Sequence, residues 1–222
     1  MTKSSAMIKN WTKSTLIGSV IAALIAMTGG MWAASTLLAP ASLDNADLHA
    51  TYLGDGRDIT EFQLQDHRGD AFTNDDLKGQ WTLLFFGFTH CPDVCPMTLA
   101  ELSRAHDMLD DAGLGGNVQT VFVTVDPKRD TPERLEAYVT NFSDDFLGLT
   151  GSMEDIDVLA RDLGIAHIRH DEDGGDDYMV DHGASVLLVN PEGRFQAVFG
   201  SPHRAREMVS DLDAILRFHG PS

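Results

Sequence analysis

Two predominantly apolar runs stand out in the pattern of hydrophobic and polar positions. Residues 81–88 read WTLLFFGF, and residues 118–125 read VQTVFVTV. Apolar runs of this length are typical of strands that are covered on both faces of a sheet. Between them, apolar residues recur three to four positions apart over residues 97–111, which predicts a helix linking two neighbouring strands.

The remainder of the chain continues to alternate between strand and helix patterns. Thr131 followed by Pro132 indicates a helix start, because threonine caps free amides and proline fits the first turn. The other predicted elements are a β-hairpin turning at 66–70, helices at 132–142, 154–163 and 202–218, and an antiparallel strand pair at 184–189 and 195–199. This order predicts an α/β fold, with a mixed sheet flanked by helices.

The N-terminal segment has a different pattern. Residues 14–39 form a stretch of 26 residues without a charge, which is long enough to span a bilayer as a helix. The lysines before it predict a cytoplasmic segment at 1–13 and an exported C-terminal body. A cleaved signal peptide is the alternative, but the apolar region is longer than such peptides use. We therefore predict a transmembrane anchor at 14–39 and a linker at 40–60, followed by one domain at 61–222.

The net charge of the chain limits the kinds of molecule that it can bind. All 34 acidic residues but only 13 of the 16 basic residues lie beyond position 40, so the body is strongly acidic. Such a body repels nucleic-acid phosphates and favours cations or basic protein surfaces. The first arginine is Arg57, which argues against an arginine-rich mitochondrial presequence. We expect a single-pass protein of the bacterial inner membrane with its C-terminal domain in the periplasm.

The only two cysteines, Cys91 and Cys95, lie directly after the first predicted strand. A cysteine motif between a strand and its helix is the thioredoxin-like arrangement. A purely structural disulfide is disfavoured, because a loop with three intervening residues constrains the chain little. The three intervening residues are expected to place the sulfurs one helical turn apart on the same face. Redox chemistry and a soft-metal site for monovalent copper or zinc both remain open, and a metal needs a further ligand.

Nine histidines are available as that ligand, and sequence context separates only some of them. His90 abuts Cys91 and is expected to point away from the site, and His167 and His170 are interpreted as solvated. His182 precedes Gly183 at the entrance to a predicted strand, where a backbone can approach closely. His182 is therefore a candidate ligand. The remaining histidines have no motif context: His49, His67, His106, His203 and His219.

Four separated blocks give the chain a specific resemblance. The blocks are FGFTHCPDVCP at 86–96, VDPKRDTP at 125–132, LTGS at 149–152, and VDH at 180–182 together with LVNPEG at 188–193. In this order they resemble the Sco/SenC family. Two departures are Met97 and Gly183, where the family more often has hydroxyl residues. The two alternatives for Met97 are tuning of the copper site and packing against the fold, and we expect packing.

The resemblance implies a thioredoxin-like fold and one copper ion bound by Cys91, Cys95 and His182. It also implies that copper is delivered to the dinuclear copper-A centre of cytochrome c oxidase subunit II, so the protein would be a chaperone rather than an enzyme. A periplasmic copper donor and a thiol reductant would be further partners.

Two hypotheses from other classes compete with the chaperone. One is a periplasmic thiol–disulfide oxidoreductase whose redox-active disulfide is Cys91–Cys95, with Cys91 as the attacking thiol. It would keep client cysteines reduced for metallation. The other is a thiol peroxidase, which is disfavoured because the nearest downstream arginine is Arg104.

Overall fold

The computed structural model describes most of the chain after position 46. The described residues are 24–25, 27–28, 43, 47–170 and 178–220. The chain divides into two units, Met1–Ser42 and Leu43–Ser222.

Several sequence predictions concern residues outside this description. The cytoplasmic segment 1–13 lies outside it, as does nearly all of the anchor predicted at 14–39. In the described part of the chain, no helix combines the length and the apolar character that crossing a bilayer requires.

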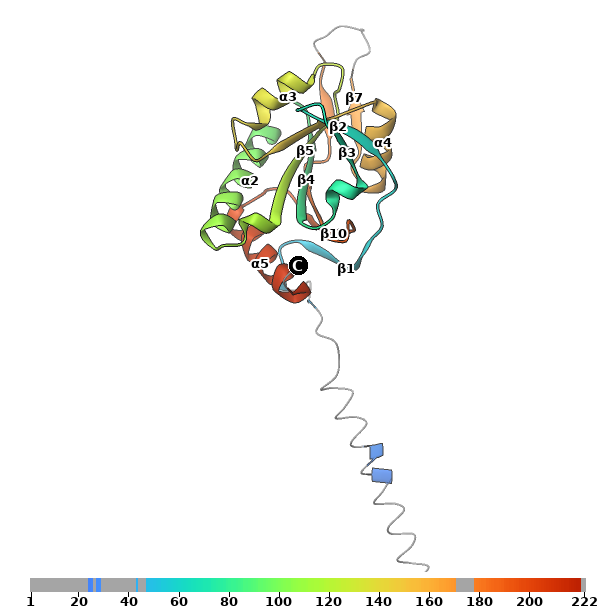
Figure 1. The fold of residues 1–222 in the computed structure, drawn as a ribbon, viewed down its shortest axis with the longest axis vertical. Coiled ribbons are helices and arrows are strands. Elements are labelled where there is room, and N and C mark those ends of the chain that lie inside the picture. The colour runs from blue at the N-terminus through green and yellow to red at the C-terminus, as the bar shows by residue number, and fades with distance from the viewer. Residues whose placement is uncertain (1–23, 26, 29–42, 44–46, 171–177, 221–222) are drawn as a thin grey trace, which may run out of the picture. The chain divides into compact units, whose positions relative to one another are not determined.

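A mixed sheet forms the centre of the second unit (Figure 1). Its strands are β1 (Thr51–Arg57), β2 (Gln63–Asp66), β3 (Ala71–Thr73), β4 (Trp81–Gly87), β5 (Val118–Thr124), β6 (Leu147–Thr150), β9 (Val186–Val189) and β10 (Phe195–Phe199). Their order is β1–β10–β9–β4–β5–β6–β2–β3 among the described residues. β4, β5 and β6 run parallel to one another, and the other neighbouring pairs are antiparallel. The parallel strands therefore end at the same edge of the sheet.

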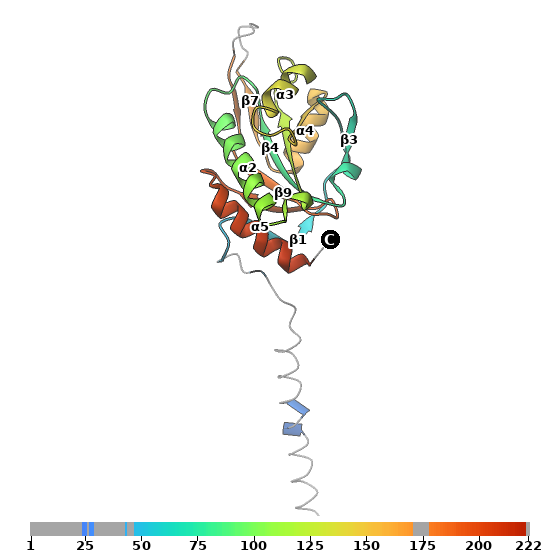
Figure 2. The same cartoon turned by 60° about the vertical axis from the view of Figure 1, so that its left-hand side comes forward.

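The main helices are α2 (Val94–Asp111), α3 (Pro132–Val139), α4 (Met153–Asp162) and α5 (Ala205–His219). Two short 3-10 helices, η2 (Asn74–Leu77) and η3 (Gly115–Asn117), precede β4 and β5. Figures 1 and 2 show α2 and α4 on opposite sides of the central strands, and α5 packs along α2. The prediction of a mixed sheet flanked by helices is confirmed.

The core lies around β4 and β5, as their apolar runs predict. Every residue of β4 is buried, and Phe85, Phe86 and Phe122 are fully buried. Burying such side chains stabilises the fold by about 1.5–3 kcal/mol each. The cysteine motif follows β4 immediately, so this rigid strand fixes where the motif begins.

The structure corrects two expectations about element bounds and adds a strand. The predicted linker is wrong for residues 51–57, because they form β1 and pair with β10 at the edge of the sheet. The strand β6 was not predicted. The helix α2 begins at Val94 rather than at residue 97, because Pro96 in its first turn needs no amide hydrogen bond.

Candidate metal centre

The cysteines are placed by the junction between β4 and α2. After Gly87 the chain turns, and the amide of Cys91 donates to the carbonyl of Phe88 at 3.2 Å. Cys91 thus precedes the helix, while Cys95 lies in its first turn. The expectation that both sulfurs lie one helical turn apart on one helix face is therefore wrong. The sulfurs meet because the turn folds Cys91 back, so that its Sγ accepts from the Cys95 amide at 3.4 Å.

Gly87 leaves room for the buried sulfur. A Cβ added at this residue would lie 2.8 Å from the Cys95 Sγ and 2.7 Å from the ring of Phe122. Real side chains do not approach so closely, so any other residue here would displace the sulfur or the ring. The glycine at the end of β4 is thus part of the site.

The histidine arrives from a separate two-stranded sheet. It consists of β7 (His167–Arg169) and β8 (Val180–His182), with His167 paired to His182 in antiparallel register. The rings of Phe85 and Phe88 meet the His182 ring edge-on, with centroids 6.0 and 5.8 Å away. These contacts fix the plane of the imidazole above the end of β4.

The tautomer of His182 follows from its hydrogen bond. Its Nδ1 lies 3.0 Å from the carbonyl oxygen of Gly183, and a carbonyl can only accept, so Nδ1 carries the hydrogen. In the neutral ring, Nε2 then holds the lone pair. A carbonyl that orients a histidine in this way is a usual feature of metal sites.

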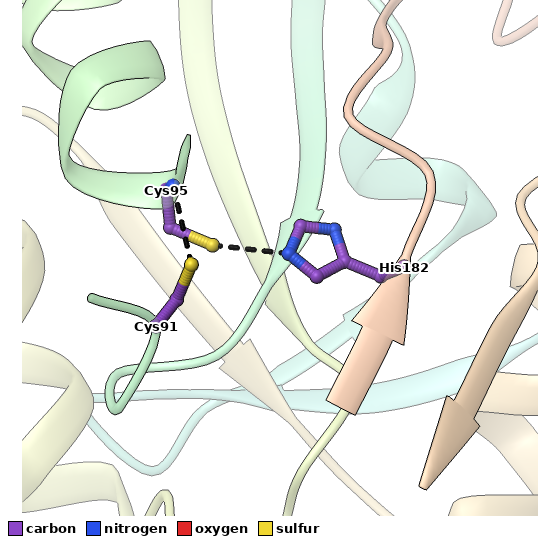
Figure 3. A group of neighbouring side chains, drawn as sticks. All are labelled: Cys91, Cys95 and His182. Carbon is purple, nitrogen blue, oxygen red and sulfur yellow. Dashed lines mark hydrogen bonds between the residues drawn. The ribbon is translucent and has the colours of Figure 1, made fainter. Parts of the chain in front are cut away.

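The three predicted residues converge (Figure 3). The Nε2 atom of His182 lies 3.2 Å from the Cys95 Sγ, and one donor atom from each residue lies within 4.8 Å of the others. Cys95 is completely buried, whereas Cys91 is partly exposed. Both thiols are free rather than joined in a disulfide.

The two thiols differ strongly in acidity. A hydrogen bond from the Cys95 thiol lowers the pKa of Cys91 to about 4, with further help from backbone amides. The same hydrogen bond, together with burial, raises the pKa of Cys95. In the metal-free pair, Cys95 is therefore the protonated thiol, and Cys91 is a thiolate.

Alkylation of Cys91 by iodoacetamide should show this acidity directly. Because the thiolate is the nucleophile, the rate is expected to be nearly independent of pH between 6 and 8, where an ordinary cysteine gains about tenfold per pH unit. In Cys95→Ala the thiol donor is lost, so the profile should move to higher pH. A wild-type rate that rises with an ordinary cysteine's slope would contradict the assignment.

A buried carboxylate secures the loop before the cysteines. Asp130 is fully buried, and it accepts from the Thr89 amide at 3.0 Å, the Thr89 hydroxyl at 2.6 Å and the Thr124 hydroxyl at 2.6 Å. Charge-assisted hydrogen bonds of this kind are strong. They join the cysteine loop to the end of β5.

A second buried carboxylate secures the approach to His182. Asp126 accepts from the Arg129 guanidinium and from the Tyr178 hydroxyl. Arg129 also stacks on the Tyr178 ring at 3.7 Å and donates to the Tyr178 carbonyl at 3.0 Å. Tyr178 lies two residues before β8, so this cluster anchors the strand that ends in His182.

Sequence reasoning assigned no function to either aspartate. For Asp126, its position directly after the apolar run at 118–125 was the available signal, because a carboxylate there must find partners when it is buried.

The other histidines near the site point elsewhere. His90 receives a hydrogen bond from Arg134 at 2.9 Å and turns toward α3, as expected. The prediction that His167 is solvated is wrong, because its side chain is 12% exposed and lies 2.9 Å from Asp157 on α4. His170 is half-exposed beside Asp181.

The identity of the three donor atoms indicates which metal ion the site would hold. Two sulfurs and one imidazole nitrogen suit a soft monovalent ion such as Cu(I), whereas structural zinc usually takes four ligands. Among the described residues, this is the one cluster of three or more His, Cys, Asp or Glu side chains arranged to hold a metal. The fold and the site together define a thioredoxin-like protein with a Cys–Cys–His centre.

Comparison with known proteins places the chain within that class. The SCO1/SenC family model matches residues 52–217. "Protein SCO1 homolog, mitochondrial" of Mus musculus is 38% identical over 71% of this chain and 56% of its own length. The chain therefore belongs to the SCO1/SenC family, and it spans about half the length of the mammalian SCO1 relatives.

Solved structures agree with this placement. Arabidopsis thaliana ScoI with copper bound has a TM-score of 0.64 and 35% identity, covering 72% of this chain and 97% of that one. Bradyrhizobium japonicum ScoI with copper bound has a TM-score of 0.61 and 34% identity, covering 72% and 99%. The thioredoxin-like fold is confirmed by these likenesses.

Proposed function

We propose that this chain is a copper-carrying protein that serves the assembly of cytochrome c oxidase. The observation that carries the proposal is the meeting of Cys91, Cys95 and the unprotonated Nε2 of His182 within 4.8 Å. Two thiolate sulfurs and a neutral imidazole are ligands that monovalent copper prefers. The copper-bound relatives support the same cargo.

Transfer would proceed by ligand exchange at the exposed side of the site. Cys91 is partly exposed and already a thiolate in the metal-free pair, while Cys95 is buried. An acceptor can therefore reach the metal past Cys91 first. We infer that the acceptor is the copper-A centre of cytochrome c oxidase subunit II, and that a periplasmic donor loads the site.

The uncharged stretch at 14–39 supports the location of this activity. With Lys3, Lys9 and Lys13 before it, the stretch would anchor the chain once in the bacterial inner membrane. The copper-binding domain then lies in the periplasm. In that oxidising compartment, a Cys91–Cys95 disulfide would remove both sulfur donors, so a thiol reductant is a necessary partner.

The acidity of the pair favours a second candidate function, thiol–disulfide exchange. The Cys91 thiolate would attack a client disulfide and form a mixed disulfide with it, releasing one client thiolate. Cys95 would then pass its proton to the released client thiolate, attack the Cys91 sulfur and release the second client thiolate, which leaves the client reduced and Cys91–Cys95 oxidised. This reaction uses two electrons from the cysteines and needs no contribution from His182.

Complementation separates the two functions. In a bacterial strain whose gene for this chain is deleted, oxidase copper content is expected to fall, and added copper should restore it. The wild-type gene should complement, and both Cys91→Ser and His182→Ala should fail. Full complementation by His182→Ala would contradict copper carriage and favour the reductase. His170→Ala, in the same hairpin but outside the site, is the matched control and should complement.

A further inference from the structure

A cavity of about 370 Å³ lies beside the first turns of α2, next to the copper site. Its lining joins α2 to the segment between β10 and α5: Val94, Met97, Thr98, Ala100, Glu101, Arg104, Ser201, Pro202 and His203. Val94 and Thr98 flank Cys95 along the chain. The proposed function uses none of these residues.

Met97 is unusual among them. Its side chain is 58% exposed, so the expectation that it packs against the fold is wrong. Because it is exposed, this methionine contributes little hydrophobic stabilisation to the fold, and its thioether sulfur remains available as a soft ligand. Met97 is thus both a lining residue of the cavity and open to solvent.

His203 contributes a nitrogen with a free lone pair. Its Nε2 lies 2.6 Å from the carbonyl oxygen of Ala184, so Nε2 carries the hydrogen. In the neutral ring, Nδ1 then holds the lone pair, and it has no hydrogen-bond partner among the described residues. His182 shows the same arrangement, with one nitrogen held by a carbonyl and the other turned toward the sulfurs.

The other polar groups of the cavity are either occupied or chemically unsuited. The two carboxylate oxygens of Glu101 bind Arg104 and the Ala205 amide. Thr98 and Ser201 offer hydroxyl oxygens, which are hard donors. Met97 and His203 thus supply the soft or borderline donors of the lining.

We propose that the Met97 sulfur and the His203 Nδ1 form a second metal site, which takes monovalent copper. Thioether and imidazole are ligands for Cu(I), and a thioether selects against hard divalent cations. The proposed site lies beside the first one. Met97 is on α2 with Cys95, and His203 bonds the carbonyl of Ala184, two residues after His182. The proposal does not depend on the first site, because the two share no ligand.

Binding of Cu(I) can be tested with the first site removed. The full chain carrying Cys91→Ser, Cys95→Ser and His182→Ala, in detergent micelles, is titrated anaerobically with Cu(I) against a chromophoric chelator. One equivalent should bind, and the Met97 methyl resonance, identified by its absence in Met97→Leu, should shift. The Met179 methyl, 52% exposed on another part of the molecule, should not shift. Circular dichroism confirms that the variant is folded.

Single substitutions complete the test. Added to the triple variant, Met97→Leu and His203→Gln are each expected to weaken Cu(I) binding at least about tenfold, and Met179→Leu is expected to leave it unchanged. Because Met97 is exposed, its replacement does not endanger the fold. An unshifted Met97 methyl at one equivalent, or unchanged affinity in Met97→Leu, would overturn the proposal. If the triple variant is unfolded, the second equivalent of Cu(I) bound by the wild type gives the same two readouts.

Discussion

Replacing His182 with alanine is expected to weaken Cu(I) binding at least about 100-fold without altering the fold. Loss of a group that merely orients a ligand typically costs 10–100-fold in metal affinity, so loss of the ligand itself should cost at least as much. The side chain is partly exposed and ends β8, so little packing is lost. Anaerobic competition with a chromophoric chelator at pH 7 measures the affinity.

His170→Ala is the matched control for this experiment. His170 directly follows β7, and its Nε2 lies 2.8 Å from Asp181 rather than near the sulfurs. Its replacement should leave Cu(I) affinity within about twofold of wild type, in keeping with the small energies of exposed ion pairs. Wild-type affinity in His182→Ala would refute the ligand assignment, whereas equal losses in both variants would indicate damage to the hairpin.

Replacing Asp126 with alanine is expected to lower the free energy of unfolding by about 3–5 kcal/mol. The carboxylate is fully buried, and the substitution removes an acceptor of the Arg129 guanidinium and of the Tyr178 hydroxyl. Urea denaturation followed by circular dichroism measures the change. Because Tyr178 leads into β8, Cu(I) affinity should fall as well.

A double-mutant cycle tests the cause of this loss. Asp126→Ala combined with Arg129→Met should cost less than the sum of the single substitutions, because the double variant removes both partners of the buried ion pair together. Lys78→Ala, which removes a surface partner of Asp75, should change stability little. Additive losses in the cycle would show that the ion pair is not the source of the effect.

The sequence predicts the central elements well because their patterns are strong. The runs that became β4 and β5 are almost wholly apolar, and Thr131 caps α3 as its side chain predicts. β1 escaped prediction because it is a sheet-edge strand in which only Tyr52 is buried, and its two glycines interrupt any alternation. β7 has only three residues, too few for a period to appear.

The sequence likewise predicts some residues of the candidate site and not others. Cys91 and Cys95 are visible as a local motif, but 87 positions separate Cys95 from His182, and no periodicity links them. The family resemblance nominated His182, and the β7–β8 hairpin explains how it reaches the sulfurs. The partners of Asp126 and Asp130 depend on loops that meet only after folding, so the chain pattern alone could not assign them.

The division of the donors between two sheets has a consequence for release of the metal. Cys91 and Cys95 belong to the rigid body built on β4, whereas His182 sits on a two-stranded sheet that, within the described part of the chain, shares no ladder with the main one. Withdrawing the imidazole therefore breaks no backbone pairing of the main sheet. If the chain carries copper as we propose, small movements of the β7–β8 hairpin would change the distance from the imidazole to the sulfurs while the β4 ladder keeps both cysteines in place.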